Sequence, residues 1–180
     1  MSKALMLLAV MISLPAIAED CYPVNASQAS VRYEVKQAGA PFRGAFRSFG
    51  GTVCLAGDRI TRIDVWLDPA SVDSGLPEID AALKEKDFFA VAQYPRVTYA
   101  SRTVETSGRG QLAHGALQMK GKQRDLDVPF SVQREGNRIT ASGSLTLDRV
   151  DYDVGTGEWS NTQWLSNEVK VEFRATLSAK

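Results

Sequence analysis

Alternation of apolar and charged residues with a period of two is the feature that most restricts how this chain can fold. Residues 31–36 read VRYEVK, and residues 169–177 repeat the same alternation close to the C-terminus. Successive side chains of a β-strand point to opposite faces of its sheet, so this pattern places one face in a core and the other in water. The chain is therefore expected to consist largely of strands that bury one face.

Between these two segments the same reasoning predicts further strands, at residues 46–55, 60–68, 96–104, 111–119, 126–133 and 138–147. Turn-forming pairs such as Gly57-Asp58 and Gly121-Lys122 separate them. About eight amphipathic strands with short connections indicate an all-β fold, either an antiparallel barrel or a sandwich.

One stretch departs from this period. Ile79 and Leu83 stand at helical spacing among good helix formers, which predicts a short helix from Glu78 to Lys84. We expect this helix to lie across the sheet or over one open end, and to deliver the following Phe88 and Phe89 to the core.

The N-terminal residues 1–18 read as a cleavable secretory signal. Lys3 precedes an apolar run at residues 4–12, and the small-residue pattern Ala16-Ile17-Ala18 forms a cleavage site. A bilayer span needs about 20 apolar residues, and this run is far shorter. The sequence therefore predicts that residues 19–180 form an exported domain that works outside the cytoplasm.

Charge and cysteine content fit an exported domain. Removal of Lys3 leaves 20 of the 21 basic residues against 21 acidic ones, a net charge of about −1, which gives no electrostatic reason to expect nucleic acid as a partner. Cys21 and Cys54 are expected to form a disulfide in an oxidising compartment, although two free thiols are the alternative. No metal site is expected, because two thiols and the remote His114 do not complete a tetrahedral ligand set.

Catalytic motifs give little support for an enzyme. The sequence contains no G-x-S-x-G elbow and no S-x-x-K pair, and its one histidine, His114, lies in a predicted strand. The acidic residues Asp148, Asp151, Asp153 and Glu158 lack the spacing of an EF-hand loop and are better explained as a solvated turn than as a calcium site.

Aromatic and large aliphatic side chains gather on one face of the predicted strands. A barrel of about eight strands has an interior that is either just filled by side chains or wide enough for one ligand, and alternation alone leaves both possibilities open.

Five motifs in order resemble the YceI-like family of bacterial periplasmic proteins, over about residues 20–177. They are GAFRSFGG at 44–51, DPASVDSG at 68–75, KDFF at 86–89 followed by Tyr94-Pro95, LQMKG at 117–121, and LDRVDYDVGTGEW at 147–159. The resemblance implies an extended, lipocalin-like antiparallel β-barrel with a helix near one end. It also implies that the hydrophobic interior holds a long polyisoprenoid chain, such as an isoprenoid quinone or a prenyl pyrophosphate.

The sequence departs from this family where polar residues would meet a ligand head group. Gln37 stands where many relatives carry histidine, and residues 79–83 read IDAAL where relatives carry Arg-Asp-x-His-Leu. Because a buried anion requires cationic donors, the loss of these side chains favours a neutral quinone head over a pyrophosphate.

Together these observations predict a non-catalytic carrier or reservoir for an isoprenoid lipid, with transient contact to a membrane or a membrane protein and a homodimer as further expected partners. The alternatives are an enzyme that uses the barrel interior as its site, and a filled barrel that serves as a stress-linked interaction protein. Arg149 and Trp159 are expected to shape one mouth, with a purely structural Arg149 equally open, and Trp159 and Trp164 could instead cap the core. The predicted ligand-binding residues are Phe46, Phe49, Phe88, Phe89, Tyr99, Leu117, Phe130, Leu145, Arg149, Trp159 and Phe173.

Overall fold

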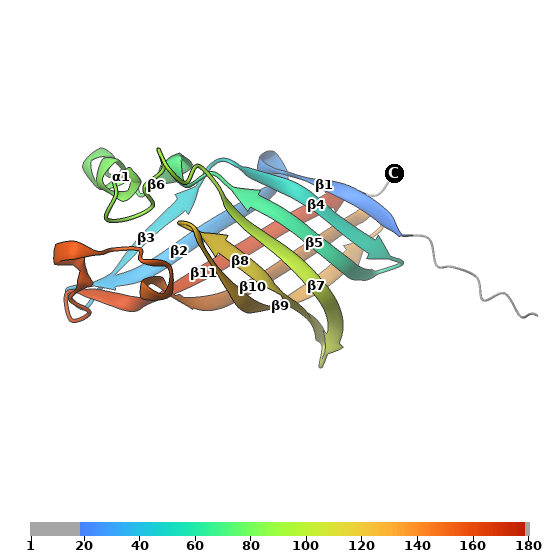
Figure 1. Cartoon of the computed structure of the whole chain (residues 1–180). Coiled ribbons are helices and arrows are strands. Elements are labelled where there is room, and N and C mark those ends of the chain that lie inside the picture. The colour runs from blue at the N-terminus through green and yellow to red at the C-terminus, as the bar shows by residue number, and fades with distance from the viewer. Residues whose placement is uncertain (1–18, 179–180) are drawn as a thin grey trace, which may run out of the picture.

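The computed structural model describes residues 19–178, which form one continuous antiparallel sheet with a single α-helix (Figure 1). The predicted signal at residues 1–18 lies outside the described residues. The strands are β1 (Asp20–Asn25), β2 (Ala29–Gln37), β3 (Ala40–Phe46), β4 (Phe49–Ala56), β5 (Arg59–Leu67), β6 (Val72–Asp73), β7 (Val97–Ser107), β8 (Gly110–Met119), β9 (Lys122–Glu135), β10 (Arg138–Asp148) and β11 (Leu165–Ser178). The helices are α1 (Pro77–Lys84) and the short 3-10 helices η1 (Ala26–Gln28), η2 (Pro69–Ser71), η3 (Arg149–Tyr152) and η4 (Gly157–Ser160).

These eleven strands occupy eight positions in the wall, the number predicted from the sequence. The chain passes from β1 to β2 through η1, and from β3 to β4 across Arg47 and Ser48, so each pair is one strand with a break. The strand pairing supports this description. β2 pairs antiparallel with β3 and β1 pairs antiparallel with β4, so β1–β2 and β3–β4 form the two arms of one hairpin. The remaining extra strand, β6, has two residues and pairs only with the end of β3.

The broken strand β1–β2 closes the sheet into a barrel. Its first half pairs with β4 and its second half pairs with β11, so the order β4, β5, β7, β8, β9, β10, β11 returns to the strand from which it started. Figure 1 shows the strands curling around a common interior, with α1 at one end. The all-β, lipocalin-like barrel with one helix is therefore confirmed.

Eight of the observed strands overlap the eight predicted segments, but β1, β3 and the two-residue β6 were not predicted as strands of their own. Pro23 in β1 and Pro41 and Gly44 in β3 are residues that weaken a strand prediction, because proline lacks a backbone donor and glycine lacks a side chain to pack. The helix begins one residue earlier than predicted, at Pro77, which suits the first helical turn.

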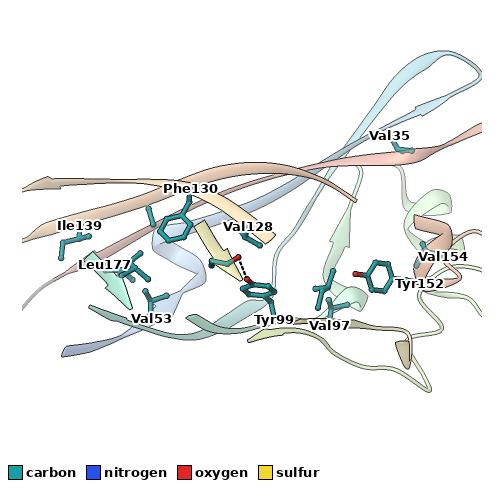
Figure 2. Close-up of a cluster of buried hydrophobic side chains, with 14 of the residues drawn as sticks. Val35, Val53, Val97, Tyr99, Val128, Phe130, Ile139, Tyr152, Val154 and Leu177 are labelled. Carbon is teal, nitrogen blue, oxygen red and sulfur yellow. Dashed lines mark hydrogen bonds between the residues drawn. The ribbon is translucent and has the colours of Figure 1, made fainter. Parts of the chain in front are cut away.

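One end of the barrel, the sealed end, is filled by side chains. Leu55, Ile60, Ile139 and Leu177 are each at most 2% exposed, and Figure 2 shows Ile139 and Leu177 at the opposite side of the cluster from Tyr152. Buried Gln111 clasps the backbone of Ile60 here, accepting from its N–H at 3.0 Å and donating to its carbonyl at 2.9 Å. β5 pairs with β7 only over residues 64–67, so the Gln111 side chain provides hydrogen-bond partners for backbone groups of β5 outside that ladder.

The other end, the helix end, is covered by irregular segments rather than strands. The segment after α1 and the loop containing η3 and η4 lie together there (Figure 1). The Asp87 carbonyl joins them, because it accepts from the backbone N–H groups of Gly155 at 2.7 Å and Thr156 at 2.9 Å.

Pairing between β9 and β10 stops before it reaches the helix end. The last matched residues are Ser131 and Ser142, and beyond them β9 pairs with β8 alone. Pro129 explains this ending: its carbonyl faces Gly143 of β10, so its nitrogen lies on the same edge, where it has no hydrogen to donate.

Cys21 and Cys54 face each other across the β1–β4 ladder and form the predicted disulfide, with their Cα atoms 4.0 Å apart. The bond ties the first strand of the described chain to the sealed end. Among residues 19–178, no helix has the length and apolar character required to cross a bilayer.

Replacing both cysteines by alanine should lower the free energy of unfolding by about 2–4 kcal/mol, because the bond closes a long loop and β1 otherwise depends on one ladder. Urea denaturation of the oxidised protein, the reduced protein and the double variant would measure this. Equal denaturation midpoints for the oxidised and reduced proteins would contradict the expectation.

Candidate functional site

The barrel interior contains a cavity of about 380 Å³, within the range of natural ligand pockets. Side chains from both broken strands, from β5, β7 to β11 and from α1 line it. The lining side chains are mostly aliphatic and aromatic, and they include no aspartate, glutamate, lysine or histidine among the described residues. The interior is thus neither filled solid nor built for polar chemistry.

The structure brings all eleven predicted ligand-binding residues to this one cavity. Their contact with a ligand stays a prediction. The residues are Phe46, Phe49, Phe88, Phe89, Tyr99, Leu117, Phe130, Leu145, Arg149, Trp159 and Phe173.

Aromatic pairs join the wall to the cover at the helix end. Phe89 meets Phe46 of β3 edge to face, with ring centroids 5.8 Å apart, and Phe88 meets Trp159 at 5.4 Å. The segment after α1 therefore delivers both phenylalanines to the interior, as predicted.

Many further lining residues were not singled out from the sequence. The signal for most of them was the alternation itself, since they occupy inward positions of strands whose other members were named. They include Tyr33, Val35, Ile63, Val65, Trp66, Met119, Leu126, Val128, Leu147, Val169 and Val171.

Arg149 is held in place by backbone carbonyls of the helix end. All of its N–H groups donate, at 2.8–3.0 Å, and the side chain is buried, with 5% of its surface exposed. The acceptors are the carbonyl oxygens of Val154, Gly155, Trp159, Leu165 and Ser166. Because a guanidinium has five N–H donors, none is left for a ligand.

Gly155 is the residue that makes this arrangement possible. Its φ of +78° is left-handed, and a Cβ at this position would lie 2.3 Å from Nη1 of Arg149. The Arg149 side chain therefore fixes the loop over the cavity rather than a head group inside it.

Tyr99 places its hydroxyl in the wall with its hydrogen bonds satisfied. Oη donates toward the carbonyls of Ala113 at 3.0 Å and Leu126 at 3.3 Å, and a dashed line marks the Tyr99 hydrogen bond in Figure 2. Tyr99 therefore offers a ligand its ring rather than a free hydroxyl.

The titratable residues considered as alternatives lie outside the cavity lining. His114 contacts Asp127 at 2.7 Å and Glu105 at 3.2 Å, and these hydrogen bonds, Asp127 first, raise the pKa of its imidazole above the usual 6.5. It has neither a nucleophile among these partners nor a place on the cavity wall, as expected of an ordinary strand histidine.

The acidic residues at and just after the end of β10 stabilise the turn there. Asp148 accepts from the backbone N–H of Val150, and Asp153 pairs with Lys122 at 2.7 Å.

Trp164 does not cap the core, since it is 50% exposed. It lies in the loop after η4, and Arg149 binds both ends of this loop through the carbonyl oxygens of Trp159 and Leu165.

A family model described as a YceI-like domain matches residues 22–177. A UPF0312 protein of Vibrio parahaemolyticus is 26% identical over 178 residues, which cover 92% of this chain and 93% of the relative. A UPF0312 protein of Shewanella oneidensis is 28% identical over 138 residues, covering 71% of this chain and 72% of the relative.

Solved structures share the fold. The crystal structure of BcnA from Burkholderia cenocepacia superimposes with a TM-score of 0.81 at 29% identity, covering 85% of this chain and 98% of that protein. A polyisoprenoid binding domain from Saccharophagus degradans, described as implicated in plant cell wall breakdown, gives a TM-score of 0.70 at 18% identity, covering 88% and 98%.

Substitution of Arg149 by methionine should lower the free energy of unfolding by more than about 3 kcal/mol, because buried carbonyls lose charged donors. Lysine should rescue little of this loss, since its ammonium has three donors in a different geometry. Urea denaturation measures the effect, and Arg109→Met in the exposed turn between β7 and β8 is the matched control. A lysine variant as stable as the unmodified protein would contradict the assignment.

Proposed function

The chain belongs to the YceI-like family, and from that premise we propose that it binds a long-chain isoprenoid lipid inside its barrel, without catalysis, as a periplasmic carrier or reservoir. The apolar cavity inside the barrel is the observation that carries the proposal. Transfer of hydrocarbon from water to such a surface is favourable by about 25 cal/mol per Å². A membrane lipid that must cross an aqueous compartment gains this free energy inside the barrel.

An isoprenoid suits the shape of the site. Apolar lining runs from Phe130 and Ile60 near the sealed end to Phe88 and Trp159 at the helix end, so one elongated hydrocarbon can contact it throughout. The fold neighbour from Saccharophagus degradans, described as a polyisoprenoid binding domain, is compatible with this ligand class.

The electrostatics of the lining favour a neutral head group, such as a quinone, over a pyrophosphate. Arg149 has no free donor, and Arg174, the other arginine at the cavity, has an exposed side chain. A buried pyrophosphate without cationic partners would be strongly disfavoured.

The predicted export agrees with the carrier role. The disulfide between Cys21 and Cys54 is expected in an oxidising compartment, which agrees with the signal predicted at residues 1–18.

The helix end carries three exposed apolar side chains, those of Leu76, Val150 and Trp164. We propose that this end makes the transient contact with a membrane during loading. The homodimer stays a prediction.

Organic extraction of the protein purified from its native host, followed by mass spectrometry, tests the proposal directly. We expect an isoprenoid lipid at close to one molecule per protein chain. A chain purified repeatedly without lipid, and unable to acquire an isoprenoid from vesicles, would contradict the carrier role.

Leu117→Trp should reduce the bound isoprenoid severalfold, because the larger side chain takes up volume inside the cavity. Gln118→Trp is the matched control, since Gln118 neighbours Leu117 on β8 but is exposed. Lipid content is compared after confirming cooperative thermal unfolding of both variants. A folded Leu117→Trp protein with undiminished lipid would remove Leu117 from the binding surface.

A further inference from the structure

The cavity stops at an apolar floor before the barrel ends. Beyond it, Leu55, Ile139 and Leu177 fill the sealed end; each is at most 2% exposed, and none of the three lines the cavity. The lining side chains adjoin these three residues through strand neighbours, since Val53 and Ala141 lie two positions from Leu55 and Ile139, and Ile60 pairs with Leu55. We call Val53, Ile60, Phe130 and Ala141 the floor.

Phe130 has the largest side chain of the floor, and its backbone is fixed on both sides. It pairs with Gln111 of β8, whereas its neighbour Ser131 pairs with β10, so Phe130 lies where β9 changes partner. The Gln111 side chain in turn holds the backbone of Ile60. Figure 2 shows Phe130 between Leu177 on the sealed side and Tyr99 on the other. The ring is therefore a firm stop at the closed end of the cavity.

The floor suits hydrocarbon and no other chemical group. Its four side chains are apolar, and the polar groups close to it are already bonded to backbone: the Gln111 amide to Ile60, and the Tyr99 hydroxyl to Ala113 and Leu126. A polar head group buried there would lose its water without gaining a partner. The end of an apolar tail has no such cost.

We propose that Phe130 sets the longest isoprenoid tail that the barrel accepts, because the end of the tail meets its ring. The inference rests on the proposed function and deepens it by naming a determinant of chain length. An isoprene unit that leaves a membrane for the cavity keeps apolar surroundings, whereas a unit for which the cavity has no room is left in water. Uptake from a membrane should therefore fall at least about tenfold for the first unit beyond the limit.

The test measures the preferred tail length of the unmodified protein and of floor variants. Delipidated protein is equilibrated with phosphatidylcholine vesicles that contain prenylated benzoquinones differing by single isoprene units, and the bound quinones are quantified by mass spectrometry. Phe130→Ala should move the limit to tails longer by about one unit, because the ring it removes is close to an isoprene unit in size. Ala141→Leu adds volume to the same floor and should move the limit to shorter tails.

Val132→Ala is the matched control. Val132 follows Phe130 on the same face of β9 and packs against the core, but it does not line the cavity, so its truncation should leave the limit unchanged. Phe130→Leu, a milder change, should shift the limit in the same direction as Phe130→Ala and by less. Cooperative thermal unfolding is confirmed for every variant before its lipids are measured.

The outcomes separate this inference from the proposed function. A limit that is the same in folded Phe130→Leu and Ala141→Leu as in the unmodified protein, or that Val132→Ala shifts as far as Phe130→Ala does, would overturn the role of Phe130 and leave lipid binding in place. An unmodified protein that takes up every tail length equally would do the same. Failure of the unmodified protein to take up a quinone of any length would overturn the proposed function itself.

Discussion

Closure of the sheet through the broken strand β1–β2 is the constraint on which the rest of the structure depends. One strand pairs with β4 at the sealed end and with β11 toward the helix end, so the sheet has an inside only because this strand changes partner at η1. A closed antiparallel barrel satisfies its backbone hydrogen bonds within the wall. Its interior therefore does not have to supply polar partners for backbone groups. The disulfide at Cys21 fixes the first half of the same strand, and the cavity is the space that closure encloses.

The backbone polar groups at the two ends of the barrel are satisfied in different ways. At the sealed end, Gln111 and fully packed aliphatic side chains leave no free backbone group at Ile60. At the helix end, the cover consists of loops, and the single guanidinium of Arg149 supplies the donors that a strand would have supplied. Loops held by a few side-chain bonds open more easily than a laddered wall, which agrees with our proposal that the helix end makes the contact with a membrane.

Much of the fold and of the cavity lining could be predicted from particular residues. The alternation at residues 31–36 and 169–177 identified strands of the wall, and the same period placed Tyr99, Leu117, Phe130 and Phe173 on the inner face. β1 and β3 escaped prediction because proline and glycine weaken a strand signal in a single sequence, even though Gly44 is required opposite Tyr33. A cap on the core was one alternative for Trp164, which is instead half exposed, since apolarity alone does not reveal which side of a loop a residue occupies.

The sequence by itself determined the all-β class, the inner face and eleven of the side chains that meet inside, because these follow from a period of two and from local composition. Only the tertiary structure decided whether the interior is filled or hollow, because that depends on how eight wall positions curve and on where side chains stop short of the axis. It also decided that Arg149 has no donor to spare, and that the Tyr33 hydroxyl is buried without a hydrogen-bond partner among residues 19–178. Hydrogen-bond satisfaction is a property of residues far apart in sequence, such as Arg149 with Ser166, and no local pattern records it.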